Sequence, residues 1–110
     1  MNVAEALRTA TLLVDDDRAK VHGPREISLA NIAELWNAYL GIRRDQKAPL
    51  DSSDVCKMMA LLKIARMESG VFNSDNWIDA CGYLAIGLEL ETETDPSVIP
   101  IISRKKVDHP

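Results

Sequence analysis

Charged side chains with helical spacing lie in the second half of the sequence. Lys63 and Arg66 are three residues apart in an otherwise apolar segment, so on a helix they project from neighbouring positions. Asp75, Asp79 and Tyr83 follow at intervals of four residues, and on a helix they share one face. These five residues are the main candidates for chemistry.

Two interpretations of these residues stay open. In the first, Lys63 and Arg66 form an ion-pair cluster with Asp79 that fixes the angle between two helices. In the second, the same cations surround a phosphate, while Asp75 or Asp79 holds a sugar hydroxyl, a metal or a base edge. An arginine fork and a lysine ammonium both suit phosphate oxygens. Arg18 and His22, in a loop before the second helix, are further ligand-binding candidates.

Several other function classes lack support. His22 and His109 are the only histidines, and neither a Gly-x-Ser-x-Gly motif nor a glycine-rich phosphate loop occurs. Cys56 and Cys81 lie in apolar stretches without Cys-x-x-Cys spacing, which predicts buried thiols and no metal site built on sulfur. The net charge of −4 disfavours DNA or RNA as a partner. No cofactor is expected.

The first two helices are predicted from caps and apolar stripes. Asn2 and Glu5 form a capping-box-like pair at the start of the first helix. Its stripe, which we expect to face the core, is Val3, Leu7, Ala10 and Val14. Pro24 can occupy the first position of the second helix, and Gly41 is placed to end it. One face of this helix carries Leu29, Ala33, Trp36 and Leu40.

The next two helices follow similar signals. Residues 51–54 offer caps for a helix that continues to Met67, and it is apolar nearly all the way round. Such a helix must be central, and a partner chain is expected to cover part of it. Residues 73–75 cap a fourth helix from Asn76 to about Leu90, where Gly82 and Gly87 suggest close packing. Trp36 and Trp77 are interpreted as core anchors.

The segment after the fourth helix is predicted to be non-helical. Pro96 and Pro100 break helices, and residues 98–102 form a short β-prone run, read as an extended arm or as an edge strand. The expected organisation is one helical domain, 1–90, and an arm, 91–110. Because no apolar run approaches the roughly 18 residues of a membrane span and no signal peptide is seen, no membrane partner and a cytoplasmic location are expected.

The order of several motifs resembles a small bacteriophage family of unknown function, often labelled MazG-like. The resemblance covers roughly residues 18–88 and rests on His22-Gly23-Pro24, Leu35-Trp36-Asn37-Ala38-Tyr39-Leu40-Gly41, Leu61-Leu62-Lys63-Ile64-Ala65-Arg66 and Asp75-Asn76-Trp77-Ile78-Asp79-Ala80-Cys81-Gly82-Tyr83. Three positions depart from the usual pattern: His22 replaces a tyrosine, Pro24-Arg25 replaces an Asp/His-Pro pair, and Leu29 replaces a phenylalanine.

The resemblance implies a four-helix MazG-like bundle, phage origin and activity in the host cytoplasm. MazG-type pyrophosphatases gather Mg²⁺ with several carboxylates, but this chain has no Glu-Glu-x-x-Glu, and Asp75 and Asp79 are the only metal-ligand candidates in the motif region. The first hypothesis is therefore an oligomeric protein that binds a nucleotide or cyclic nucleotide and sequesters a host immune signal, an anti-defence sponge. The alternatives are a divergent Mg²⁺-dependent nucleotide pyrophosphatase and a protein-binding inhibitor that uses the arm.

Overall fold

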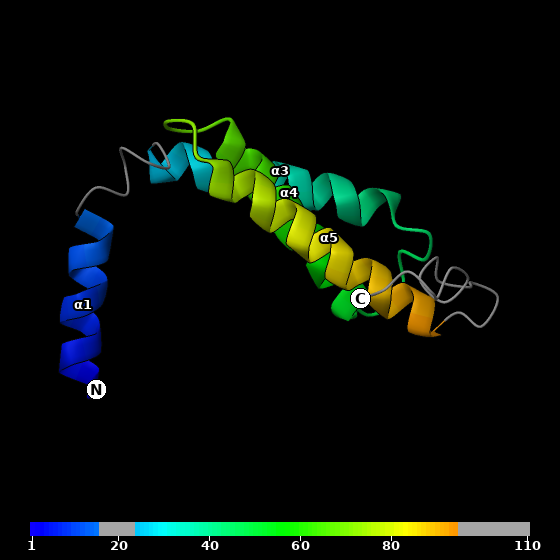
Figure 1. Ribbon diagram of the computed structural model, residues 1–110, viewed down its shortest axis with the longest axis horizontal. Helices are drawn as coiled ribbons and strands as arrows, with labels where there is room; N and C mark the ends of the chain where they lie inside the picture. The colour runs from blue at the N-terminus through cyan, green and yellow to red at the C-terminus, as the bar shows by residue number, and fades with distance from the viewer. Residues whose placement is uncertain (16–23, 95–110) are drawn as a thin grey trace, which may run out of the picture.

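The computed structural model describes residues 1–15 and 24–94, and in this part of the chain helices joined by loops are present and no strand is. Its elements are α1 (Val3–Asp15), α3 (Arg25–Ile42), α4 (Ser52–Met67) and α5 (Ser74–Thr94) (Figure 1). The prediction of an all-α fold is confirmed. The predicted arm loses its first residues to α5, which continues to Thr94; residues 95–110, with the β-prone run, lie outside the described residues.

Helices α1 and α5 each begin close to a side chain that accepts one of their free N–H groups. Asn2 Oδ1 accepts a hydrogen bond from the Glu5 N–H at 2.9 Å, and Asn73 Oδ1 does the same for Asp75 at 2.9 Å. Such side-chain acceptors satisfy donors that a helix leaves free at its start. Helix α3 has no side-chain cap: Pro24 stands just before it, and the Pro24 carbonyl accepts the first ordinary intrahelical hydrogen bond, from Ser28 N at 3.0 Å.

Helix α4 is central, as predicted, because α3 and α5 both pack against it (Figure 1). On the α5 side, Ser53 meets Glu91 and Lys63 meets Asp79. The residue number rises from 53 to 63 along α4 while that of the partner on α5 falls from 91 to 79, so the two helices are antiparallel. Gly70, with φ 71°, lies in the turn between them, in the left-handed region that favours glycine.

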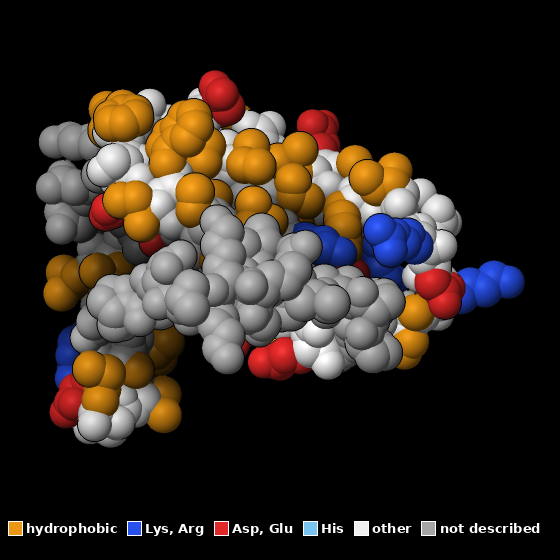
Figure 2. Space-filling model, turned by 45° about the vertical axis from the view of Figure 1, so that its right-hand side comes forward, with side chains coloured by type: hydrophobic (Ala, Val, Ile, Leu, Met, Phe, Trp, Pro, Cys, Tyr) orange, Lys and Arg blue, Asp and Glu red, His pale blue; other side chains and the backbone are white. Residues whose placement is uncertain are grey.

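The core of the described residues is small. Its buried apolar members are Ile32, Cys56, Ala60, Ala65 and Ala80. Ile32 is the only large aliphatic side chain among them, and none of the described side chains is completely shielded from solvent. Large hydrophobic side chains are instead abundant at the surface, where they form a broad band on the face seen in Figure 2. Three-helix packing alone therefore leaves much apolar surface in water.

Helix α1 stands apart from the other three helices (Figure 1). The stripe expected to face the core is exposed, with Val3 76% and Leu7 63% accessible. The prediction that it packs within its own chain is wrong for this structure. A hydrogen bond joins α1 to α3, from Arg25 Nη1 to the Val14 carbonyl oxygen at 3.3 Å.

The predicted face of α3 is wrong at three of its four positions. Leu29, Ala33 and Leu40 are exposed, while the side that meets α4 carries Ser28, Ile32 and Tyr39. Trp36 is half-buried and donates from Nε1 to the Met58 carbonyl at 2.7 Å, as a core anchor would. The buried positions Ser28 and Ile32 each precede a predicted position, Leu29 and Ala33, by one residue. The prediction followed the hydrophobic residues and therefore chose Leu29 over Ser28, which is small, polar and buried.

Three expectations for α5 are corrected as well. Trp77, expected in the core, is 56% exposed, and the Cys81 thiol is exposed, whereas Cys56 is buried as predicted. A Cβ added at Gly82 would meet nothing within 4 Å, so Gly82 makes no close helix contact. The expectation of close packing holds at Gly87, where an added Cβ would lie 3.2 Å from Cys56 Cβ.

None of the described helices is long and apolar enough to cross a membrane.

Candidate functional site

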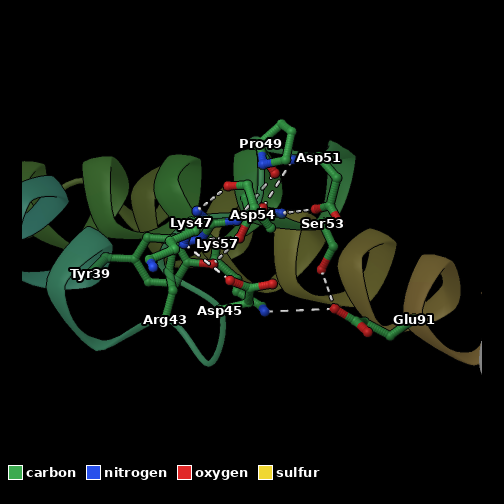
Figure 3. A network of polar contacts seen from close by, with 11 residues as sticks. Tyr39, Arg43, Asp45, Lys47, Pro49, Asp51, Ser53, Asp54, Lys57 and Glu91 are labelled. Carbon is green, nitrogen blue, oxygen red and sulfur yellow. Dashed lines mark hydrogen bonds and ion pairs between the residues drawn. The ribbon is translucent and has the colours of Figure 1, made fainter.

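A polar network joins the end of α3 to the start of α4 (Figure 3). Asp54 is its centre: the Tyr39 hydroxyl donates to Asp54 Oδ1, and Arg43 donates from Nε to Oδ1 at 3.1 Å and from Nη2 to Oδ2 at 2.9 Å. The Arg43 and Asp54 side chains are 10% and 9% exposed. We call Tyr39, Arg43, Asp51 and Asp54 the Asp54 network. A planar arginine fork on a largely buried carboxylate is a strong, well-defined pair.

The local sequence explains this geometry. Tyr39 and Arg43 are four residues apart and so lie on one side of the last turns of α3. Asp51 caps α4 by accepting from Asp54 N at 2.9 Å, while Asp54 Oδ2 accepts from Asp51 N at 2.9 Å, which completes a capping box. Arg43 also donates to the carbonyl oxygens of Ala48 at 2.9 Å and Pro49 at 3.3 Å. The network therefore fixes the α3–α4 loop.

The protonation equilibria in the network are shifted away from neutral pH. The hydrogen bond from Tyr39, followed by those from Asp51 N–H and Arg43, holds the pKa of Asp54 well below its usual value. Burial, followed by the hydrogen bond to Asp54, raises the pKa of Tyr39 from 10.0 to about 12. Because neither group titrates near pH 7, the pair is poorly suited to proton transfer. Its geometry indicates a structural role.

A second cluster ties the far end of α5 to the same region. Ser53 Oγ donates to Glu91 Oε1 at 2.6 Å, and Lys57 Nζ lies 3.7 Å from the same oxygen. Lys57 Nζ also lies 5.9 Å from the centre of the Tyr39 ring, within reach of a cation–π contact. The hydrogen bond from Ser53 and then the charge of Lys57 lower the pKa of Glu91. Residues from the end of α3, the start of α4 and the end of α5 thus meet in one region (Figure 3).

Neither cluster was predicted as a site from the sequence. The signals were present in the capping pattern Asp51-x-x-Asp54 and in the four-residue spacing of Tyr39 and Arg43. Nothing in the spacing, however, indicated that the end of α3 meets the first turn of α4. That contact depends on the packing of two helices joined by a loop.

The candidates chosen from the sequence on α4 and α5 lie toward the other end of this helix pair, where Lys63 and Asp79 meet. We call these residues the α4–α5 seam: Lys63, Arg66, Asp75, Asp79 and Tyr83. Lys63 Nζ lies 2.9 Å from Asp79 Oδ2, and the side chains are 14% and 44% exposed. Of the predicted ion-pair cluster, the pair between Lys63 and Asp79 is therefore present. Within the described residues, Arg66 is half-buried and is not paired with Asp79.

The other seam residues surround this pair along α5. Asp75 is exposed one turn before Asp79, and Tyr83 is half-buried one turn after it. Between them, Asn76 is 3% exposed, and its Nδ2 is buried without a hydrogen-bond partner among the described residues. An unmade hydrogen bond on a buried donor costs about 1–3 kcal/mol. Asn76 thus offers an unused donor in the first turn of α5.

The remaining candidates are not brought into this site. Arg18 and His22 lie outside the described residues. Across residues 1–15 and 24–94, no three His, Cys, Asp or Glu side chains gather closely enough to hold a metal ion. Asp75 and Asp79 could contribute two carboxylates to Mg²⁺, which usually keeps several waters when bound by proteins. A metal at the seam would also compete with Lys63 for Asp79.

Comparisons with known proteins place this chain among phage proteins. The gene 55 protein of Mycobacterium phage L5 is 30% identical over 89 residues, an alignment that covers 81% of this chain and 54% of the phage protein. The chain thus spans about half the length of that relative. A comparison of this chain with solved structures found no match. These findings support the expected small phage family of unknown function. A family model described as a domain of unknown function, DUF6378, matches residues 5–91, which contain both the Asp54 network and the α4–α5 seam, and the chain therefore belongs to the DUF6378 family.

Proposed function

We propose that this protein binds a nucleotide-like anion at the α4–α5 seam. The observation that carries the proposal is the set of groups around the Lys63–Asp79 pair. Lys63 is largely enclosed, with Arg66 three residues further along α4, and both cations are of the kind that binds phosphate oxygens. Asp75 and Tyr83, one turn to either side on α5, would contact the sugar or base.

The Lys63–Asp79 ion pair is compatible with such a ligand. Asp79 is the more exposed partner, so an incoming phosphate can reach Lys63 from the side that Asp79 occupies. Phosphate oxygens would then replace the carboxylate at the ammonium group, and Arg66 would supply the second cation. The unpaired Nδ2 of Asn76, three residues before Asp79 on α5, supports the proposal because this donor has no acceptor among the described residues.

The proposed biological role is sequestration of a host signalling nucleotide, such as a cyclic nucleotide used in immunity. What supports this role is the similarity to a phage protein together with the shortage of carboxylates for hydrolysis among the described residues. A protein that only binds its ligand needs charge complementarity and donors, whereas a hydrolase also needs an activated water.

The test is a titration of nucleoside triphosphates and cyclic nucleotides, with the melting temperature as the measurement. Binding to the folded state raises the melting temperature by mass action. We expect at least one compound to do so, and Lys63→Ala and Arg66→Ala to abolish the rise while the proteins stay folded. Lys47→Ala, which removes an exposed lysine in the α3–α4 loop, is the matched control and should respond as wild type does. No response from wild type to any compound would contradict the proposal.

The rival proposal is a divergent MazG-like nucleotide pyrophosphatase, for which Asp75 and Asp79 are the candidate Mg²⁺ ligands. Such an enzyme would need further carboxylates from outside the described residues or from a second chain. The variant Asp79→Asn distinguishes the two proposals. In a pyrophosphatase, this substitution should remove Mg²⁺-dependent release of pyrophosphate while nucleotide binding persists. In a sequestering protein, wild type itself releases no pyrophosphate from any substrate.

A protein-binding inhibitor remains the third candidate, and the observation that favours it is the exposed apolar surface. The arm through which it was expected to act lies mostly outside the described residues. Retention of a host protein by wild type, lost on deletion of residues 95–110, would support this candidate over the other two.

A further inference from the structure

An apolar stripe runs along α5 on the side not used for packing against α4. The α5 stripe consists of Trp77, Cys81, Leu84 and Leu88, which follow one another at intervals of four, three and four residues. All four are exposed, including Trp77 at 56% and Leu88 at 66%. The buried residues of α5, such as Ala80 and Gly87, lie on another side of the helix. The stripe thus has the pattern of a helix-packing face but lacks a partner within the described residues.

Helix α1 carries a stripe with the same spacing. The α1 stripe consists of Val3, Leu7, Ala10 and Val14, again at intervals of four, three and four residues, and all four are exposed. An isolated helix of this length is only marginally stable in water, because its stability in proteins comes mainly from packing an apolar face. The 13 residues of α1 therefore require a surface that the described part of their own chain does not supply.

We propose that the α1 stripe of one copy of this chain packs on the α5 stripe of a second copy. In this exchange each copy packs its α1 on the α5 of the other copy, so a symmetric dimer contains two identical α1–α5 contacts. Both stripes span 12 residues, 3–14 and 77–88, and so run about 17 Å along their helices at the usual helical rise. The occupant of the α5 stripe is therefore a second copy of this chain.

Charge favours α1 over another α5 as the occupant. Helix α5 carries five acidic residues and no lysine or arginine: Asp75, Asp79, Glu89, Glu91 and Glu93. Lysines of α4 pair with Asp79 and Glu91, so the repulsion between two packed α5 helices would come mainly from Asp75, Glu89 and Glu93, just beyond the two ends of the stripe. The positions beside the α1 stripe are uncharged, because Ala4, Ala6 and Thr11 occupy them. An α1 helix can therefore lie along the acidic α5 without repulsion at its edges.

The first experiment measures the mass of the full chain in solution by light scattering. We expect wild type to be a dimer and Leu7→Asp and Leu84→Asp to be monomers, since each places a charge in one stripe. Leu12→Asp and Ile86→Asp are the matched controls: both residues are exposed leucine or isoleucine on the same two helices but outside the stripes. Both controls should remain dimeric. A monomeric wild type, or a dimer that Leu7→Asp leaves intact, overturns the proposal.

The second experiment decides whether α1 reaches the partner or folds back on its own chain. Ala10→Cys and Leu7→Cys place a thiol in the α1 stripe, opposite Cys81 for antiparallel and parallel helices respectively. We expect oxidation to link one of these variants into a covalent dimer and Cys81→Ser to abolish the link. A disulfide within a single chain, or no link in either variant, contradicts the exchange. Circular dichroism checks that each variant keeps its helices, and neither readout depends on nucleotide binding.

Discussion

Asp54 shows how much a single residue can determine in a chain with a small core. Its carboxylate accepts hydrogen bonds from Tyr39, from two nitrogens of Arg43 and from the Asp51 N–H. Tyr39 lies in α3, Arg43 directly follows that helix, and Asp51 caps α4. Since the group is nearly buried and fully ionised, each donor offsets part of the cost of desolvating the charge. Removing any donor should therefore destabilise the loop and both helix ends together.

Tyr39→Phe tests the hydroxyl in this network. The change removes one donor to a carboxylate without altering the ring, and we expect unfolding free energy to fall by about 1–2 kcal/mol in denaturant titrations. Tyr83→Phe, on a half-buried tyrosine of α5, is the control and should change stability by less. Equal effects of the two substitutions would argue against a special role for Tyr39.

The raised pKa of Tyr39 also predicts behaviour in alkali. Because the folded-state pKa is about 12 and the ordinary value is 10.0, the stabilisation is fully present below pH 10.0 and is lost as pH rises through about 12. In the Tyr83→Phe protein, where Tyr39 is the only tyrosine, phenolate absorbance should appear near pH 12. Titration near pH 10.0 in the folded protein would contradict the assignment of Tyr39 as a buried hydroxyl that donates to Asp54.

Acid should destabilise the protein through Asp54. Its pKa is lowered in the folded state from an ordinary value of 3.8, so its stabilisation is present above that pH and is lost as pH falls through the folded-state pKa. Asp54→Asn should be less stable than wild type at neutral pH and should lose less stability on acidification. Glu34→Gln, which changes an exposed carboxylate on α3, is expected to follow the wild-type curve. Parallel acid curves for wild type and Asp54→Asn would contradict this assignment.

The residue scale also shows what the sequence could reveal about sites. The pairing of Lys63 with Asp79 was predictable, since two charged residues on consecutive helices with a short turn are brought close whenever the helices pack antiparallel. The Asp54 network was not, although its capping box can be read from Asp51 and Asp54. Tyr39 and Arg43 look like ordinary surface residues of a helix until the position of α4 is known.

At the level of elements, helix positions were more predictable than helix faces. Caps depend on local backbone geometry, so Asn2 and Asp51 marked the starts of their helices correctly, whereas α3 continues one residue past Gly41, which was expected to end it. Faces depend on neighbours. The predicted face of α3 was wrong because Ser28 is small enough to lie against α4, and Trp77 was placed in the core because an apolar stripe looks the same whether its partner is in the same chain or another.

The two glycines of α5 give an element-scale test. Gly82 has open space where a Cβ would lie, so Gly82→Ala should stabilise the protein by about 0.5–1 kcal/mol through better helix propensity. At Gly87 the added Cβ would lie 3.2 Å from Cys56 Cβ, and the same gain is opposed by a close contact between α4 and α5. Gly87→Ala should therefore be less stable than Gly82→Ala in thermal or denaturant unfolding. The reverse order would mean that α5 packs on α4 by a different side.

At the level of the whole molecule, the balance between buried and exposed apolar side chains is the main feature. One large aliphatic residue, Ile32, is buried among the described residues, while large hydrophobic side chains are exposed on α1 and α5 as well as on α3. A domain this small already buries a modest share of its surface when folded alone. The sequence indicated this shortage through the apolar helix 54–67, from which a partner chain was expected. It did not indicate which surfaces would be uncovered, since that depends on how α3, α4 and α5 divide the faces between them.

This balance leads to a prediction about concentration. If association supplies packing that the monomer lacks, unfolding of the dimer includes dissociation, and the melting temperature should rise with protein concentration. Leu7→Asp, which disrupts the α1 stripe, should melt at a lower temperature that does not depend on concentration. Leu12→Asp changes an exposed leucine on the other side of α1 and should retain the wild-type dependence. A series of thermal melts over a wide concentration range measures all three. If wild type melts at the same temperature throughout the series while remaining fully helical at the start, the three-helix unit is stable without a partner, and its exposed apolar stripes do not contribute to folding.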